Sequence, residues 1–193
     1  MKRLFIITIL CLIVMSMTAI VSAQESINPQ KTSYNIAIVP YINSTEEIQG
    51  YIKETIDSKY TEQYSNNNFQ MISSVDVQKA LNSTGYDISN KELAEKDILA
   101  SVAKQTKADY VIAMEVSQLI TTRHMSFFQA KVVTKAKLHY KIYNVEKDKV
   151  VSFQVTGLSE NKTIFGDVGY KDPITKALSQ AMDEANEKIK SNL

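Results

Sequence analysis

The stretch AKVVTKAKLHYK, residues 130–141, alternates with a period of two. Its even-numbered side chains are mostly apolar, whereas its odd-numbered side chains are basic except for Val133. This period is typical of a β-strand whose two faces differ. A strand buried between two layers of helices could not carry four lysines on one side. The pattern therefore predicts a sheet with helices on one face and the other face largely open.

The rest of the chain predicts which elements surround this strand. Apolar runs or alternating patterns predict strands at 34–41, 69–73, 110–120, 127–145 and 150–158. Apolar residues at helical spacing predict helices at 45–64, 74–81, near 94–103 and at 173–189, and Ser44 with Glu47 forms a capping box before the first of them. Strands joined through a helix lie parallel, and the last three strands form an antiparallel meander. The expected fold is an α/β two-layer sandwich with a mixed five-stranded sheet, in the order β-α-β-α-α-β-β-β-α, and helices on one face.

The N-terminus carries a basic start, an apolar run and small residues at Val21–Ala23. This pattern predicts a secretory signal peptide over 1–23, cleaved between Ala23 and Gln24. The alternative is an uncleaved membrane anchor, because the run approaches the roughly 18 apolar residues that a spanning helix needs. We expect a loose leader at 24–33 and a single domain at 34–193.

Charge and cysteine content exclude several classes of protein. The formal net charge is +1 before removal of Lys2 and Arg3, so a general nucleic-acid binder is not expected. The single cysteine, Cys11, lies inside the signal segment and lacks the small residue that precedes a lipidated cysteine. We therefore expect no lipid anchor, no disulfide and no cysteine-based zinc site.

Four stretches together look like a known family. They are NIAIVPY, FQMISSVDVQKALNSTGYD, LASVAKQTKADYVIAMEVS and KLHYKIYNVEKDKVVSFQVTG. They resemble the periplasmic domain of the curli assembly and transport component G family over most of residues 34–157. The same arrangement is similar to the N-terminal domain of the Tol-Pal system's B protein and to the lipoprotein activators of penicillin-binding proteins. The resemblance implies an envelope protein of this fold, without the family's pore-forming hairpins or lipid anchor, and it supplies no catalytic residue.

The sequence offers no catalytic, cofactor or metal site. Zinc-protease, nucleophile-elbow and phosphate-loop motifs are missing from it, and His124 and His139 have no partner at a ligand spacing. We therefore expect a protein that is not an enzyme and that needs no cofactor.

Two binding sites are candidates. The first is the basic face of the 130–141 strand, with Lys131, Lys135, Lys137, His139 and Lys141. It could meet an anionic glycan, a lipid phosphate or an acidic protein surface; alternatively it is a solvated face, partly neutralised by Glu115. The second is the loop after the last strand, where Ile164, Phe165 and Tyr170 either fold back onto the core or contact a partner.

Together these observations predict an exported bacterial envelope protein, periplasmic or extracellular, that acts by protein–protein contact or assembly. An envelope protein or a second copy is the expected partner, nucleic acid is not, and membrane contact is expected only through an uncleaved signal segment. The first alternative is a binding module for an anionic envelope polymer or lipid headgroup. The second, which we disfavour, is a small secreted enzyme.

Overall fold

The computed structural model describes residues 33–164 and 169–192, so the predicted signal segment and most of the leader lie outside the described residues. The strands are β1 (Tyr34–Ile38), β2 (Ile42–Asn43), β3 (Phe69–Met71), β4 (Tyr110–Met125), β5 (Ala130–Asn144) and β6 (Lys149–Thr163). The helices are α2 (Gly50–Tyr64), α3 (Ser74–Thr84), α4 (Lys96–Thr106) and α5 (Lys171–Lys190), with a short 3-10 helix η1 at Ile88–Asn90. None of these helices is long and apolar enough to cross a membrane.

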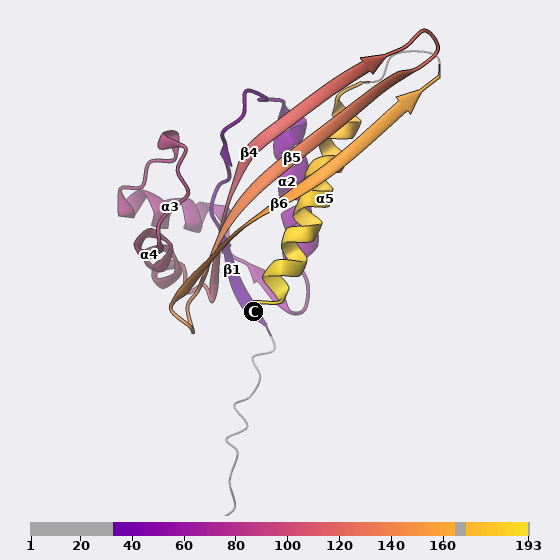
Figure 1. Ribbon diagram of the computed structural model, residues 1–193. Helices are drawn as coiled ribbons and strands as arrows, with labels where there is room; N and C mark the ends of the chain where they lie inside the picture. The colour runs from indigo at the N-terminus through magenta and orange to yellow at the C-terminus, as the bar shows by residue number, and fades with distance from the viewer. Residues whose placement is uncertain (1–32, 165–168, 193) are drawn as a thin grey trace, which may run out of the picture. The chain divides into compact units, whose positions relative to one another are not determined.

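The strands form one mixed sheet in the order β3-β1-β4-β5-β6 (Figure 1). β1 is parallel to β3 and β4, whereas β4, β5 and β6 pair antiparallel as a meander. The predicted α/β fold with a mixed sheet is confirmed. The expected five strands are joined by a sixth, β2, which pairs with β4 as a two-residue continuation beyond β1. Two residues are too few to produce a periodic signal, so the pattern could not indicate it.

Helices α2 and α5 cover one face of the sheet and form the predicted second layer (Figure 1). The even-numbered residues of β5, such as Leu138 and Tyr140, are buried against them. The core on this face also includes Ile56 of α2 and Leu178 and Met182 of α5, all fully buried. Removal of this apolar surface from water is the main stabilising contribution to the sandwich.

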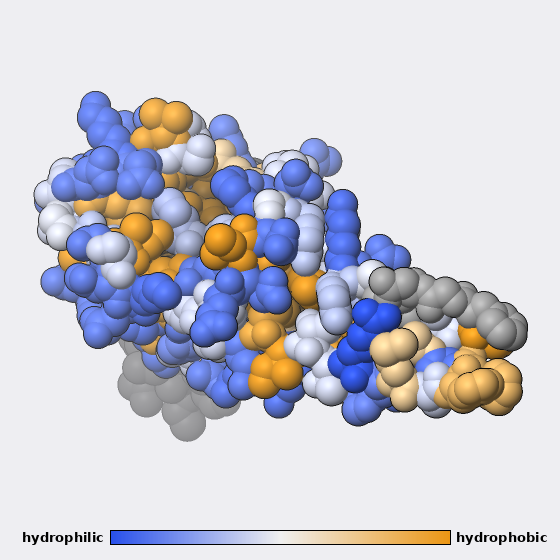
Figure 2. Space-filling model, turned by 90° about the horizontal axis from the view of Figure 1, so that it is seen from above, coloured by the Kyte–Doolittle hydropathy of each residue, from blue (hydrophilic) through white to orange (hydrophobic). Residues whose placement is uncertain are grey.

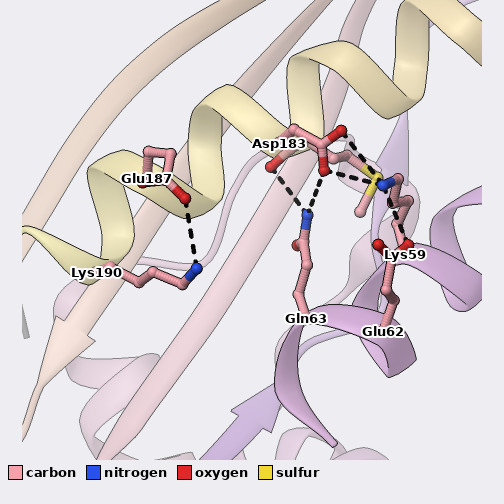
Figure 3. A network of polar contacts seen from close by, with 7 residues as sticks. Lys59, Glu62, Gln63, Asp183, Glu187 and Lys190 are labelled. Atoms are coloured by element: carbon pink, nitrogen blue, oxygen red, sulfur yellow. Dashed lines mark hydrogen bonds and ion pairs between the residues drawn. The ribbon is translucent and has the colours of Figure 1, made fainter.

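Polar side chains join α2 to α5 at the rim of this layer (Figure 3). The carboxylate of Asp183 accepts hydrogen bonds from Lys59 Nζ at 2.9 Å and Gln63 Nε2 at 3.2 Å. Gln63 also donates to the carbonyl oxygen of Met182, at 3.3 Å. These bonds fix the register of the two helices, whose apolar contacts are not directional.

Helices α3 and α4 depart from the expectation of helices on one face. They pack on the opposite side of the sheet, over β1 and the neighbouring parts of β4 and β5 (Figure 1). There Ala37, Val111 and Ala113 are buried, so β1 and the first half of β4 are apolar on both sides. The half of the meander nearer the β4–β5 turn lies beyond these two helices, and we call it the distal half. It keeps the open face that the alternating pattern predicts.

Strand β6 and helix α5 lie unusually close together. Gly157 of β6 has no side chain, and a Cβ atom built on it would lie 1.8 Å from the carbonyl oxygen of Ala177. Ala181 of α5 and Ala136, the partner of Gly157 on β5, are also small and fully buried. Side chains of α5 reach the outer edge of β6 as well: Gln180 Oε1 accepts from Leu158 N at 3.0 Å, and Lys188 Nζ donates to Gln154 O at 3.4 Å.

Candidate functional site

The distal half of the meander gathers most of the residues that the sequence marked as a binding site. Lys131, Lys135, Lys137, His139 and Lys141 lie on one face of β5, because their even-numbered neighbours are buried against α2 and α5 on the other face. We call this surface the basic face. The structure brings all five side chains to one side, but their surroundings differ from one end to the other.

The proximal end of the basic face is occupied by other parts of the same chain. Lys141 Nζ donates to Leu93 O at 3.2 Å and to Glu95 Oε1 at 2.7 Å, and its side chain is only 16% exposed. Its charge is therefore used to hold the segment before α4 against the sheet. Lys141 is positioned for an internal contact rather than for a ligand.

His139 takes part in a line of three polar side chains. Its Nε2 lies 2.9 Å from Ser152 Oγ on β6, and its Nδ1 lies 3.6 Å from Glu115 Oε2 on β4. Glu115 also accepts from Ser44 Oγ at 2.7 Å. Glu115, the acid expected to neutralise part of the basic face, therefore lies beside His139. A hydroxyl, an imidazole and a carboxylate are in line, but acyl transfer also needs N–H donors arranged around an oxyanion.

The centre of the basic face is different, because its cations are unpaired. Lys135 and Lys137 make no side-chain hydrogen bond or ion pair with any residue in the described ranges. Lys135 lies between Ile120 of β4 and Leu158 of β6, its two partners in the sheet. Ile120 is 48% exposed and Leu158 is 58% exposed. We call Ile120, Lys135 and Leu158 the central rung.

The distal end of the basic face is a cluster of charges around one acid. Glu160 forms ion pairs with both Lys131 and Lys162. Hydrogen bonds from Lys131 and then from Lys162 lower the pKa of the Glu160 carboxyl. One carboxylate therefore pairs with two lysines, so the cluster keeps a net positive charge.

At the end of the meander the sequence marks Ile164 as a candidate contact, but it does not mark the two phenylalanines beside it. The strand expected at 127–145 begins only at Ala130, and Phe127 and Phe128 instead lie in the turn after β4. Aromatic residues favour strands, so the pattern placed them in one. Ile164 follows Thr163, the partner of Ala130, and is therefore close to this turn. Ile164 and Tyr170 are exposed rather than folded into the core, and Phe165 lies outside the described residues.

A separate pocket of about 790 Å³ opens at the carboxyl ends of β1 and β3. Its wall includes Pro40, Tyr41 and Ser73, together with the Lys53–Asp57 ion pair. Burial raises the pKa of Tyr41. Ligands of open α/β sheets commonly bind at this edge, but the cation here is already neutralised by its own acid. No group of three or more His, Cys, Asp or Glu side chains in residues 33–164 and 169–192 is arranged to hold a metal ion.

Comparisons with known proteins leave the family of the chain open. No family model matches the sequence, and no curated protein matches it. Among solved structures, the hypothetical protein CT253 from Chlamydia trachomatis is 14% identical, with 83% of this chain and 95% of that chain covered and a TM-score of 0.46. Lipoprotein GNA1162 from Neisseria meningitidis is 12% identical, with 83% and 99% covered and a TM-score of 0.46.

The LpoB C-terminal domain from Escherichia coli is similar at the same level. It is 12% identical, with 65% of this chain and 82% of that chain covered and a TM-score of 0.43. Likenesses with TM-scores below 0.5 decide neither family nor function. The resemblance to the curli component G family therefore stays a prediction, and the function proposed below rests on this chain's own residues.

Proposed function

We propose that this chain is an exported envelope protein that acts by binding a protein partner and not by catalysis. The observation that carries the proposal is the central rung, where two exposed apolar side chains flank an unpaired lysine. The proposal places the contact on the part of the basic face that no helix covers. Its proximal end is excluded, because Lys141 is bound to Leu93 and Glu95.

The chemistry of the central rung favours a partner with an apolar centre and an acidic rim. Ile120 and Leu158 would lose water-exposed surface on contact, which stabilises association. Lys135 and Lys137 would find carboxylates on the partner without first losing an ion pair of their own. Protein interfaces commonly combine an apolar centre with charged residues around it.

We expect loss of the apolar side chains to abolish the contact. A photo-crosslinking residue placed beside the central rung in the full chain should form a discrete adduct in the native cells. The double substitution Ile120→Gln and Leu158→Gln should reduce that adduct about tenfold or more, because apolar anchors at the centre of an interface dominate its binding energy.

A matched control uses the same substitutions elsewhere. Ile48 is 88% exposed and Val75 is 73% exposed, and neither is on the meander. Ile48→Gln with Val75→Gln should leave the adduct unchanged. An adduct that is equally strong in both double variants, or its absence at every position tested on the central rung, would contradict the proposal.

An anionic envelope polymer is the second candidate, favoured by the free ammonium groups of Lys135 and Lys137. In that case Lys135→Gln with Lys137→Gln should lower the salt concentration that elutes the protein from a dextran sulfate column, because screening competes with the lysines. The Ile120→Gln and Leu158→Gln double variant should elute unchanged. The two double variants therefore separate a protein partner from a polymer.

Export is tested independently of the partner. Mass spectrometry of the protein from its native cells should find an N-terminus at Gln24, because the small residues before it fit the signal peptidase. A protein that retains Met1 would show that the segment is not cleaved, in agreement with the anchor alternative.

A further inference from the structure

The turn between β4 and β5 exposes a cluster of large apolar side chains. Phe127 is 93% exposed and Phe128 is 66% exposed, and their rings meet edge to face with centroids 4.9 Å apart. Met125 is 71% exposed and Ile164 is 68% exposed. We call these four residues the apolar tip. Figure 2 shows apolar surface at the same end of the meander.

From this cluster we infer that the apolar tip inserts into the interfacial region of an anionic lipid bilayer. Exposure of this kind is costly, because each phenylalanine leaves a large apolar surface in water. Aromatic residues favour the boundary between headgroups and acyl chains, where peripheral proteins place their apolar side chains.

The shape of the tip favours a bilayer over a protein. A hairpin turn presents its side chains outward on more than one side. A flat protein surface could cover only one of those sides, whereas lipid can surround an inserted turn. The two phenylalanine rings already contact each other, so they would enter together as one compact group.

The charge behind the tip fits an anionic membrane. His124, Lys131 and Lys162 lie across the three strands in one rung, next to the rung that holds Met125. Lys131 and Lys162 supply two permanent cations in this rung against one acid, Glu160, with which both form ion pairs. The strand rise places these cations roughly 3–7 Å behind the tip, at the depth of phosphate groups when the tip is inserted.

This inference extends the sequence-based expectation, which allowed membrane contact only through residues 1–23. The inference uses no residue of the central rung, so its test is independent of the test of the proposed function. The full chain carries the apolar run of residues 4–21, and total binding to vesicles would therefore not report on the tip. A reporter on the tip itself is needed.

The chain contains no tryptophan, so a single introduced indole is an unambiguous reporter. Phe127→Trp should show a blue shift of its emission when the full chain meets vesicles of phosphatidylglycerol and phosphatidylcholine, and brominated acyl chains should quench it. Val75→Trp, on the exposed side of α3, should show neither change. With Lys131→Gln and Lys162→Gln added to Phe127→Trp, the blue shift at saturating lipid should become smaller, because the tip of a bound chain then loses its attraction to the anionic headgroups.

Each other outcome overturns the proposal. Unchanged emission of the Phe127→Trp chain on anionic vesicles would show that the tip stays in water. A blue shift that depends on protein concentration without lipid would assign the tip to a second copy of the chain. An equal shift for Val75→Trp would show that vesicles affect the whole domain and not the tip.

Discussion

Replacing Gly157 with alanine is expected to destabilise the domain by about 3 kcal/mol or more, at or beyond the upper end of what overpacking usually costs. The added methyl group would lie 1.8 Å from the carbonyl oxygen of Ala177 and 2.8 Å from the backbone nitrogen of Ala181. Both atoms belong to the backbone of α5, so no side-chain rotation relieves the clash. The helix would have to move away from β6, and the packed face between them would open.

Urea unfolding followed by circular dichroism measures this loss. Gly50→Ala is the matched control, because nothing lies within 4 Å of a Cβ atom built at Gly50. Gly50 is the first residue of α2, where alanine stabilises a helix by up to about 1 kcal/mol relative to glycine. Equal unfolding free energies for the two variants would show that α5 does not approach β6 this closely.

The second large effect is expected at alkaline pH. Burial raises the pKa of the Tyr60, Tyr64 and Tyr140 phenols well above the ordinary value of about 10. Below pH 10 the folded and unfolded chains both hold these protons. Above it only the unfolded chain releases them, so stability falls as the pH rises.

The loss is about 1.4 kcal/mol for each tyrosine and each pH unit, and three tyrosines together lose about 4 kcal/mol per unit. A domain of ordinary stability, about 5–15 kcal/mol, should therefore unfold within a few pH units above 10. Tyrosinate absorbance and circular dichroism, recorded together, should show these phenols ionising only as the chain unfolds. Ionisation of all ten tyrosines near pH 10 in a folded chain would contradict this expectation.

Tyr64→Phe is the control for the alkaline effect. The Tyr64 hydroxyl is buried and has no hydrogen-bond partner in the described residues, so its removal at pH 7 should cost little. Above pH 10 the variant should lose stability about one third more slowly, because one of the three buried phenols is gone. An unchanged slope would show that Tyr64 is not among the groups that matter.

The meander was predictable because its information is local. Residues 130–142 of β5 alternate between buried and more exposed side chains, and the neighbouring strands of the meander lie close in the sequence. The placement of α3 and α4 could not be predicted. A strand that is apolar on both sides is expected to have helices on both faces, but its sequence does not indicate which helix covers which face. The capping box at Ser44 was wrong for a similar reason: α2 begins at Gly50, and Ser44 Oγ donates to Glu115, 71 residues away.

In the candidate site, too, the features that depend on local alternation were predictable and those that depend on the fold were not. The basic face follows from alternation alone, and the structure adds that Lys141 is bound internally whereas Lys135 is not. No local pattern could show this, because Leu93 and Glu95 reach Lys141 only through the fold. Phe127 and Phe128 were read as part of a strand, and only the position of the turn shows that they are exposed.

The contacts between α5 and the outer edge of β6 have a consequence for how copies of this protein could join. An edge strand normally offers its free N–H and C=O groups to a neighbour, and β6 is long enough to pair with another chain. Gln180 and Lys188 already bind two of those groups, at Leu158 and Gln154. Growth of the sheet from one molecule into the next would have to displace α5 along this stretch, so continuous strand-to-strand polymerisation is disfavoured by the same helix that completes the core.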